Sequence, residues 1–305
     1  MKKLPENILC IGECMVEMAP REDGAYNRGF AGDTFNSAWY LSKVLPDHFT
    51  VDYFSGAGND AVSGEMLSFM EKAGVGTSSI RRIADRTVGL YMIALKNGER
   101  SFSYWRDVSA AKLLAEDKDA LRAAVKGRGM ILFSGITMAV IYAEHRQNLL
   151  DVLSEARAEG TVVAFDPNMR ARLWPSKEVM AETIMQSAAV SDIVLPSFDE
   201  DGVIFGDADP KATIARYRAI GVNTVIVKNG PETIYAEDSV EGPVTFAPTP
   251  SKNVVDTTAA GDSFNAGMIS ALMTGHSLVD ALARGSALSA RVIGARGALV
   301  EDAVA

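Results

Sequence analysis

The sequence predicts an α/β fold in which helices flank a mostly parallel central sheet. Short β-rich runs alternate with helical patterns along all 305 residues, which is typical of parallel sheets with helical crossovers. Two segments, at about residues 13–31 and 87–106, contain strands and turns but no helix. No repeat, low-complexity tract or linker interrupts the sequence. We therefore expect a single domain, residues 1–305, with a small, discontinuous antiparallel β element projecting from the main sheet.

The individual elements follow from the same runs. The predicted strands lie at 8–16, 50–55, 129–133, 161–166, 193–195 and 224–228, and the predicted helices at 34–44, 61–73 and 264–273. Asn97-Gly98 favours a hairpin turn, because both residues tolerate the left-handed conformation of such turns. Ligands of open parallel sheets bind beyond the carboxyl ends of the strands. Polar residues that directly follow a strand are therefore candidate site residues.

The composition argues against several classes of protein. An apolar fraction of 48% and a charged fraction of 23% are ordinary for a globular chain. No apolar run approaches the roughly 18 residues of a membrane span. The net charge of −9 and the lack of a basic cluster argue against a nucleic-acid-binding surface. Because the N-terminus lacks a long apolar stretch and a cleavage site, we expect a cytoplasmic protein with no membrane or nucleic-acid partner.

Cysteine and histidine offer no catalytic or metal-binding pattern. Cys10 and Cys14 are the only cysteines, and neither a disulfide framework nor a zinc site can be built from them. We expect two reduced thiols along one strand. His48, His145 and His276 lie in polar contexts, which predicts surface positions.

The segment 255–267, VDTTAAGDSFNAG, is the most informative part of the sequence. Small residues precede a helical run, so Ala259, Ala260 and Gly261 are expected at a helix start whose backbone N–H groups attract anions. Asp262 places a carboxylate where a phosphate would bind, which suggests a base acting on a hydroxyl. The alternative is an ordinary helix start with an Asp cap.

DTTAAGDSF resembles the phosphate-site signature of the ribokinase-like (PfkB) carbohydrate kinases, usually D-T-x-G-A-G-D, with Ala259 in place of the first glycine. The resemblance implies a ribokinase-like three-layer α/β/α sandwich, with ATP and Mg²⁺ as cofactors. It also implies that the β element is a lid over the sugar and often a contact between subunits of a homo-oligomer. Asp262 would be the general base, and residues 259–262 the anion hole.

Residues 29–36, GFAGDTFN, resemble the family's N-terminal sugar-binding motif at a helix start. Asp33 can accept hydrogen bonds from two hydroxyls, and Asn36 can both donate and accept. Gly32 lets the ligand approach the backbone. The alternative is that Asp33 or Thr34 only caps the helix.

Tyr104-Trp105-Arg106 resembles a segment of the 2-keto-3-deoxygluconate kinases within this family. Arg106 offers a planar fork that matches a carboxylate, and Tyr104 and Tyr91 would add contacts to the substrate. The alternative is an exposed arginine stacked on Trp105.

A second arginine follows the β run 161–166, in a segment similar to the family's D-x-N-x-R motif. The resemblance assigns Arg170 to the substrate, and Asn168 to orienting the substrate or the phosphates. Arg172 is expected to be a structural or solvent-facing neighbour. Two converging arginines would suit the carboxylate of a 2-keto acid.

Residues 197–200, SFDE, resemble the family's N-x-x-E motif, with Ser197 in place of Asn. The resemblance assigns Glu200 to magnesium and Ser197 to the nucleotide. Because Mg²⁺ often uses only one or two carboxylates, Glu200 alone is adequate, and Asp199 or Asp201 can substitute. The alternative is an acidic cluster that stabilises a helix start.

Residues 225–232, VIVKNGPE, resemble the strand and turn beneath ATP in this family. Lys228 would contact a phosphate, while Gly230, like Gly261, would allow close backbone approach. The alternative is a plain hairpin turn. No specific adenine contact is assigned, and a monovalent cation near Asp256 is left open.

Together these segments predict ATP-dependent phosphorylation of the terminal C6 hydroxyl of 2-keto-3-deoxygluconate. A fructokinase-like enzyme and a non-catalytic sugar-binding regulator on the same fold are the alternatives. The sequence has neither a Walker motif nor a G-x-G-x-x-G after its first strand, so a P-loop enzyme and a dinucleotide-binding dehydrogenase are excluded.

Overall fold

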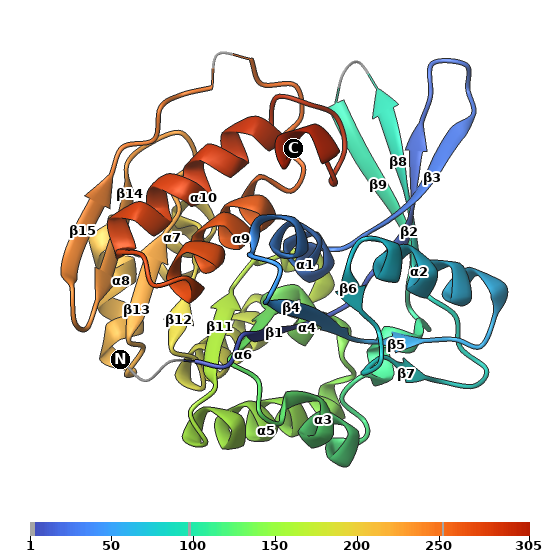
Figure 1. The fold of residues 1–305 in the computed structure, drawn as a ribbon, viewed down its shortest axis with the longest axis horizontal. Helices are drawn as coiled ribbons and strands as arrows, with labels where there is room; N and C mark the ends of the chain where they lie inside the picture. The colour runs from blue at the N-terminus through green and yellow to red at the C-terminus, as the bar shows by residue number, and fades with distance from the viewer. Residues whose placement is uncertain (1–3, 97–98, 252) are drawn as a thin grey trace.

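A nine-stranded sheet forms the centre of the part of the chain that the computed structural model describes, residues 4–96, 99–251 and 253–305 (Figure 1). From one edge to the other, its strands are β15 (Gly242–Phe246), β14 (Ile234–Asp238), β13 (Thr224–Val227), β12 (Ile193–Val194), β11 (Val162–Asp166), β10 (Met130–Ser134), β1 (Asn7–Ile11), β4 (Thr50–Phe54) and β6 (Val75–Gly76). Neighbouring strands are parallel from β6 to β13, and only the β14 and β15 pairings are antiparallel. The mostly parallel sheet predicted from the sequence is thus confirmed.

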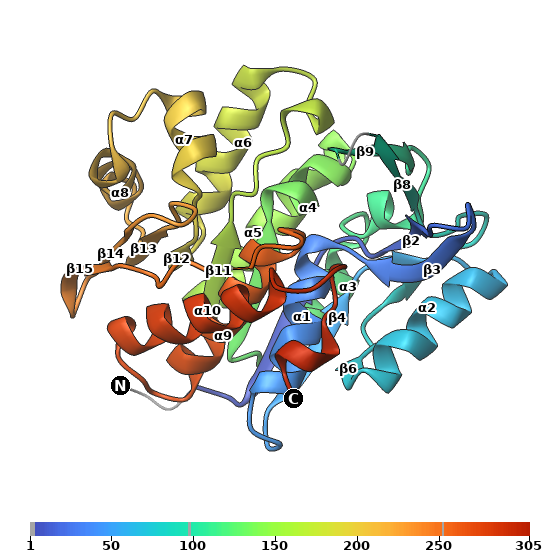
Figure 2. The same cartoon turned by 90° about the horizontal axis from the view of Figure 1, so that it is seen from above.

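Helices cover both faces of this sheet (Figure 2). They are α1 (Asp33–Val44), α2 (Ala61–Lys72), α3 (Lys118–Val125), α4 (Gly135–Val140), α5 (Arg146–Ala158), α6 (Lys177–Ala189), α7 (Phe198–Phe205), α8 (Pro210–Ala219), α9 (Ala260–Met273) and α10 (Leu278–Val292). Short 3₁₀ turns lie at Ala110–Leu113, Ala143–His145, Ala171–Leu173 and Glu301–Ala303.

Side chains that point alternately to the two faces of the central sheet produce two hydrophobic cores. In β1, Ile8 and Cys10 pack with α1, α2, α9 and α10, whereas Leu9 and Ile11 pack with α3, α4, α5, α6 and α8. Successive side chains of a strand point to opposite faces, and a parallel sheet covered on both sides needs apolar residues on each. The result is the predicted three-layer α/β/α sandwich.

A second, four-stranded sheet projects from the described body of the molecule (Figure 1). Its order is β3 (Tyr26–Ala31), β2 (Met15–Pro20), β8 (Leu90–Lys96) and β9 (Glu99–Trp105). It consists of two antiparallel hairpins joined by a parallel pairing of β2 with β8. We call this sheet the lid. A further short pair joins β5 (Gly56–Ala57) to β7 (Arg81–Arg82).

The predicted elements are found within a few residues of their expected bounds, with one exception. The apolar run 8–16 is not one strand, because β1 ends at Ile11 and the chain crosses into the lid before β2 begins. The expectation that Cys10 and Cys14 lie along one strand is therefore wrong. Both are free, buried thiols, and burial raises the pKa of each.

The remaining expectations concern surface positions and turns. His48 is exposed, whereas His145 and His276 are partly buried. Asn97-Gly98 lies outside the described residues. None of the helices in the described ranges has the length and apolar character needed to cross a bilayer.

Candidate active site

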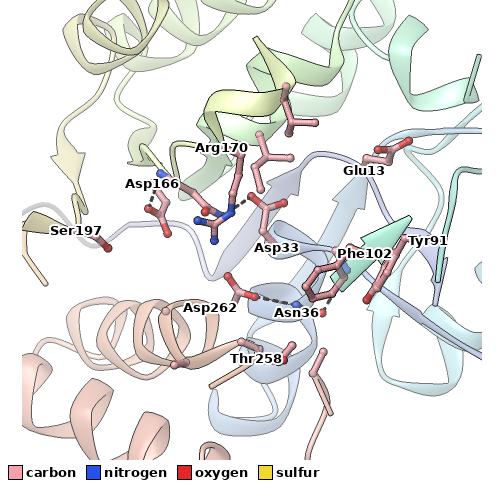
Figure 3. Close-up of a pocket in the computed structure, with 18 of the residues that line it drawn as sticks. Glu13, Asp33, Asn36, Tyr91, Phe102, Asp166, Arg170, Ser197, Thr258 and Asp262 are labelled. Atoms are coloured by element: carbon pink, nitrogen blue, oxygen red, sulfur yellow. Dashed lines mark hydrogen bonds between the residues drawn. The ribbon is translucent and has the colours of Figure 1, made fainter. Parts of the chain in front are cut away.

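A cavity of about 480 Å³ lies where the carboxyl ends of the central strands, the lid and the start of α9 meet (Figure 3). Except for Gly230, all the predicted site residues line it: Gly32, Asp33, Asn36, Tyr91, Tyr104, Arg106, Asn168, Arg170, Ser197, Glu200, Lys228, Ala259, Ala260, Gly261 and Asp262. Gly230 adopts a left-handed φ of 56° in the turn after β13. It therefore fits the plain turn that the sequence left as the alternative.

The start of α9 supplies unpaired amides to this cavity. Ala259 precedes the helix in a left-handed conformation, with a φ of 58°, which costs a residue with a Cβ roughly 1–2 kcal/mol. The amide of Ala260 donates to the Thr257 carbonyl at 3.2 Å, but the amides of Gly261 and Asp262 have no partner among the described residues. These two N–H groups can receive an anion.

The Asp262 carboxylate lies beside these amides and is partly buried. It accepts a hydrogen bond of 2.8 Å from the Asn36 side chain on α1. Burial, followed by the negative charge of Asp33, raises the pKa of Asp262 to about 8, and the Asn36 hydrogen bond opposes the rise. A carboxylate with such a pKa is well matched to accept a proton near neutral pH.

Asp33 enters the same cavity from α1 (Figure 3). It accepts a hydrogen bond of 3.2 Å from the Asn168 side chain, and burial raises its pKa. The cap position of α1 belongs to Gly32, and Thr34 is instead bonded to the buried Tyr53 hydroxyl at 2.9 Å. The capping alternative for Asp33 and Thr34 is therefore wrong.

Arg106 is tied to a partner that the sequence reading missed. Its guanidinium forms an ion pair with Glu13, and both side chains are buried, with exposed fractions of 9% and 2%. The Ser109 hydroxyl also donates to Glu13, at 2.5 Å. The alternative of stacking on Trp105 is wrong, because Trp105 is 58% exposed and Arg106 lies 5.8 Å from the centre of the Tyr104 ring.

The predicted substrate arginine and the predicted metal ligand also contact each other. Arg170 forms an ion pair of 2.5 Å with Glu200, which further accepts a hydrogen bond from the Met169 amide at 3.0 Å. Burial raises the pKa of Glu200. Asp199 lines the cavity. Asp201 does not line the cavity, so the prediction that it can substitute for Glu200 as a metal ligand is wrong.

Asp201 has a structural role instead. It is fully buried and accepts hydrogen bonds from Arg216 and Tyr217. Burial raises its pKa to about 6 despite the hydrogen bonds from these partners.

Lys228 is held in place by two residues that the sequence reading did not select. Its ammonium lies 3.0 Å from Asp166, which also accepts a hydrogen bond of 2.6 Å from the Asn265 side chain on α9. The same ammonium is 3.7 Å from the position that a Cβ on Gly261 would occupy. Lys228 therefore adds positive charge beside the unpaired amides.

Arg172 and Tyr91 both contact residues of the lid. Arg172 is exposed, lines the cavity, donates to the Tyr104 hydroxyl and lies 4.6 Å from the centre of the Tyr104 ring, which is compatible with the structural or solvent-facing role expected of it. The Tyr91 hydroxyl, expected to contact the substrate, donates to Glu17.

The missed residues share a detectable position. Glu13 follows β1 closely, and Asp166 is the last residue of β11. Both lie where polar groups of a parallel sheet gather, so the same rule that pointed to Arg170 could have found them. The side chain of Asn265 could not be assigned without the structure, because most residues of α9 near it are buried in the core.

Comparison with known proteins agrees with this arrangement. The family model "pfkB family carbohydrate kinase" matches residues 5–302. The chain belongs to the PfkB family of carbohydrate kinases. A 2-dehydro-3-deoxygluconokinase of Dickeya dadantii is 38% identical to it over 303 residues, covering 97% of each chain.

Two solved structures share the PfkB fold with this chain. The fructokinase of Xylella fastidiosa with bound ATP superposes with a TM-score of 0.84 at 23% identity, covering 97% of this chain and 94% of the other. The 2-dehydro-3-deoxygluconokinase of Thermotoga maritima superposes with a TM-score of 0.81 at 20% identity, with 98% of each chain covered. The ribokinase-like fold expected from the sequence is therefore confirmed.

Replacing Glu13 by Ala should lower the free energy of unfolding by about 3–5 kcal/mol, because Arg106 would remain buried without its partner. Urea denaturation measures this change. Glu13→Gln keeps one acceptor oxygen for Arg106, and its NH2 group can donate to the Ser109 hydroxyl, so it should cost less. An Ala variant as stable as the wild type would contradict a desolvated ion pair.

Proposed function

We propose that this kinase transfers the γ-phosphoryl group of ATP to the C6 hydroxyl of 2-keto-3-deoxygluconate, acting as a 2-dehydro-3-deoxygluconokinase. The observation that carries the proposal is the Asp262 carboxylate, with its raised pKa, beside the unpaired amides of Gly261 and Asp262. Arginines at the lid side of the same cavity suit an acidic sugar. The 38% identical relative of that name supports the choice of substrate.

Phosphoryl transfer depends mainly on alignment and on stabilising charge. Asp262 would accept the proton of the attacking hydroxyl, held in its orientation by the Asn36 hydrogen bond. The two amides and Lys228 would stabilise the oxygens of the transferred group. Asp33 and Asn168, bonded to each other, would orient the sugar hydroxyls.

Magnesium would enter with ATP and neutralise charge on its phosphates. In the described ranges no group of three or more His, Cys, Asp or Glu side chains forms a metal cage. This fits Mg²⁺, which usually keeps several waters and is held by one or two carboxylates together with substrate phosphates. Glu200, held by Arg170 and the Met169 amide, is the proposed carboxylate, and Ser197, which also lines the cavity, would contact the nucleotide.

The proposal has three further parts. A monovalent cation would bind near Asp256, a buried carboxylate that accepts hydrogen bonds from Thr258 and the Gly297 amide. The chain would act as a single domain in the cytoplasm.

The lid would contribute to a homo-oligomer, since Trp105 and Phe102 on β9 are exposed.

A coupled assay of ADP release tests the proposed function. The substrates are 2-keto-3-deoxygluconate, its galactonate epimer, fructose and ribose, each in potassium and in tetramethylammonium buffer. The two keto acids should give a higher kcat/KM than fructose and ribose, because only they offer a carboxylate to the arginines. Preference for fructose would favour a fructokinase, and no ADP release with any sugar would favour a non-catalytic binder.

Asp262→Asn should lower kcat by about 10²–10⁴, because the base is removed. In the wild type, kcat/KM should rise with pH and level off above about 8, since the carboxylate of the free enzyme accepts a proton only when it is ionised. Measurements of kcat/KM from pH 6 to 9.5 would record this rise and the plateau.

Asp85→Asn is the matched control, because Asp85 is exposed, outside the cavity, and has a φ of 60° that asparagine tolerates. This variant should keep both the kcat of the wild type and its rise of kcat/KM with pH. Near-normal turnover of the Asp262 variant would remove the proposed base.

Arg170→Ala and Arg106→Gln should raise KM for the keto acid by about tenfold or more, because hydrogen bonds to charged groups are lost. The neutral methyl ester of the same acid serves as the comparison substrate. Equal losses on acid and ester would contradict carboxylate recognition by these two residues.

A further inference from the structure

The acidic and basic side chains that line the cavity are not equal in number. Three of the lining cations are already paired with lining carboxylates: Arg106 with Glu13, Arg170 with Glu200, and Lys228 with Asp166. The other carboxylates of the cavity are Asp33, Asp199 and Asp262. An acidic substrate entering here would therefore face carboxyl groups that have no cation partner, unless a further cation faces it.

Arg172 is that cation. In the part of the chain that the structure describes, it forms no ion pair, and its polar contact is the hydrogen bond that it donates to the Tyr104 hydroxyl. It comes from the turn after β11, on the body of the molecule, and reaches across the cavity to the lid strand β9. A planar guanidinium can hold such a stacked position and still offer N–H groups to a second partner.

Aromatic rings fix the position of this group. The Arg172 guanidinium carbon lies 4.6 Å from the centre of the Tyr104 ring and 6.0 Å from that of Phe102, and the two rings are themselves stacked at 6.2 Å. Arg106 lies 5.8 Å from the same Tyr104 ring. Arg172 and Arg106 therefore both contact the Tyr104 ring, and both line the cavity.

We propose that Arg172 is a further specificity-determining residue, whose guanidinium, stacked on Tyr104, receives the carboxylate of the sugar acid and links it to the lid. The inference rests on the proposed function, since it concerns how that substrate is selected. It differs from the roles of Arg106 and Arg170, because those two arginines already have carboxylate partners within the protein.

The test compares the wild type with Arg172→Gln and Arg172→Lys on 2-keto-3-deoxygluconate and on its neutral methyl ester. Arg172→Gln should raise KM for the acid by about tenfold, with kcat within about twofold and little change for the ester. Arg172→Lys keeps the charge but not the flat stacking surface, so it should recover part of the loss. The KM of the wild type for the acid should also rise with salt more steeply than that of the Gln variant.

Arg82→Gln is the matched control, since Arg82 is exposed, lies outside the cavity and makes one long hydrogen bond, of 3.4 Å, to Asn59. Binding of the acid without ATP, followed by calorimetry, gives a readout independent of turnover. Equal losses on acid and ester would show that Arg172 only supports the lid, and unchanged kinetics would also overturn the proposal. Failure of the wild type to phosphorylate the acid would instead reject the proposed function itself.

Discussion

The crowding of carboxylates at one end of the central sheet is the constraint on which the site depends. Asp166 and Glu200 each have a cation within 3.0 Å, and Glu13 is paired with Arg106. Asp262 forms no ion pair with a described residue and has only the Asn36 amide as a side-chain partner. Because Asp262 is desolvated and, to a smaller extent, because Asp33 lies nearby, ionising Asp262 is costly, and the resulting rise of its pKa makes it a good proton acceptor near neutral pH.

The packing of α1 against α9 keeps this arrangement in place. Both helices belong to the core on one face of the sheet, with Phe35 and Phe264 among its buried residues. Asn36 on α1 bonds the Asp262 side chain, and the Ser37 hydroxyl donates to the Asp262 carbonyl at 3.2 Å. The first turns of two helices that are distant in sequence are thereby fixed to each other. Contacts within the protein therefore position the carboxylate and the unpaired amides beside it.

The sequence was sufficient for the fold and for most of the cavity lining, but not for the pairing inside the cavity. Alternating patterns and family-like motifs depend on local sequence, so the strands and Asp262 could be found without coordinates. Glu13 and Arg106 are 93 residues apart, and Lys228 and Asp166 are 62 apart. Such pairs depend on strand order, which no local pattern specifies. The break after Ile11 was missed because apolar residues resume at Cys14, directly after Gly12 and Glu13, while the chain changes sheets.

The connections between the lid and the central sheet have a mechanical consequence. β2 follows β1 after only three residues, so the lid is connected by a very short tether to the middle of the body. Glu13 lies within that tether, and Arg106 directly follows the last lid strand. The buried ion pair therefore joins the segment by which the chain enters the lid to the segment by which it leaves. One desolvated contact fixes these two connections to each other at the base of the lid.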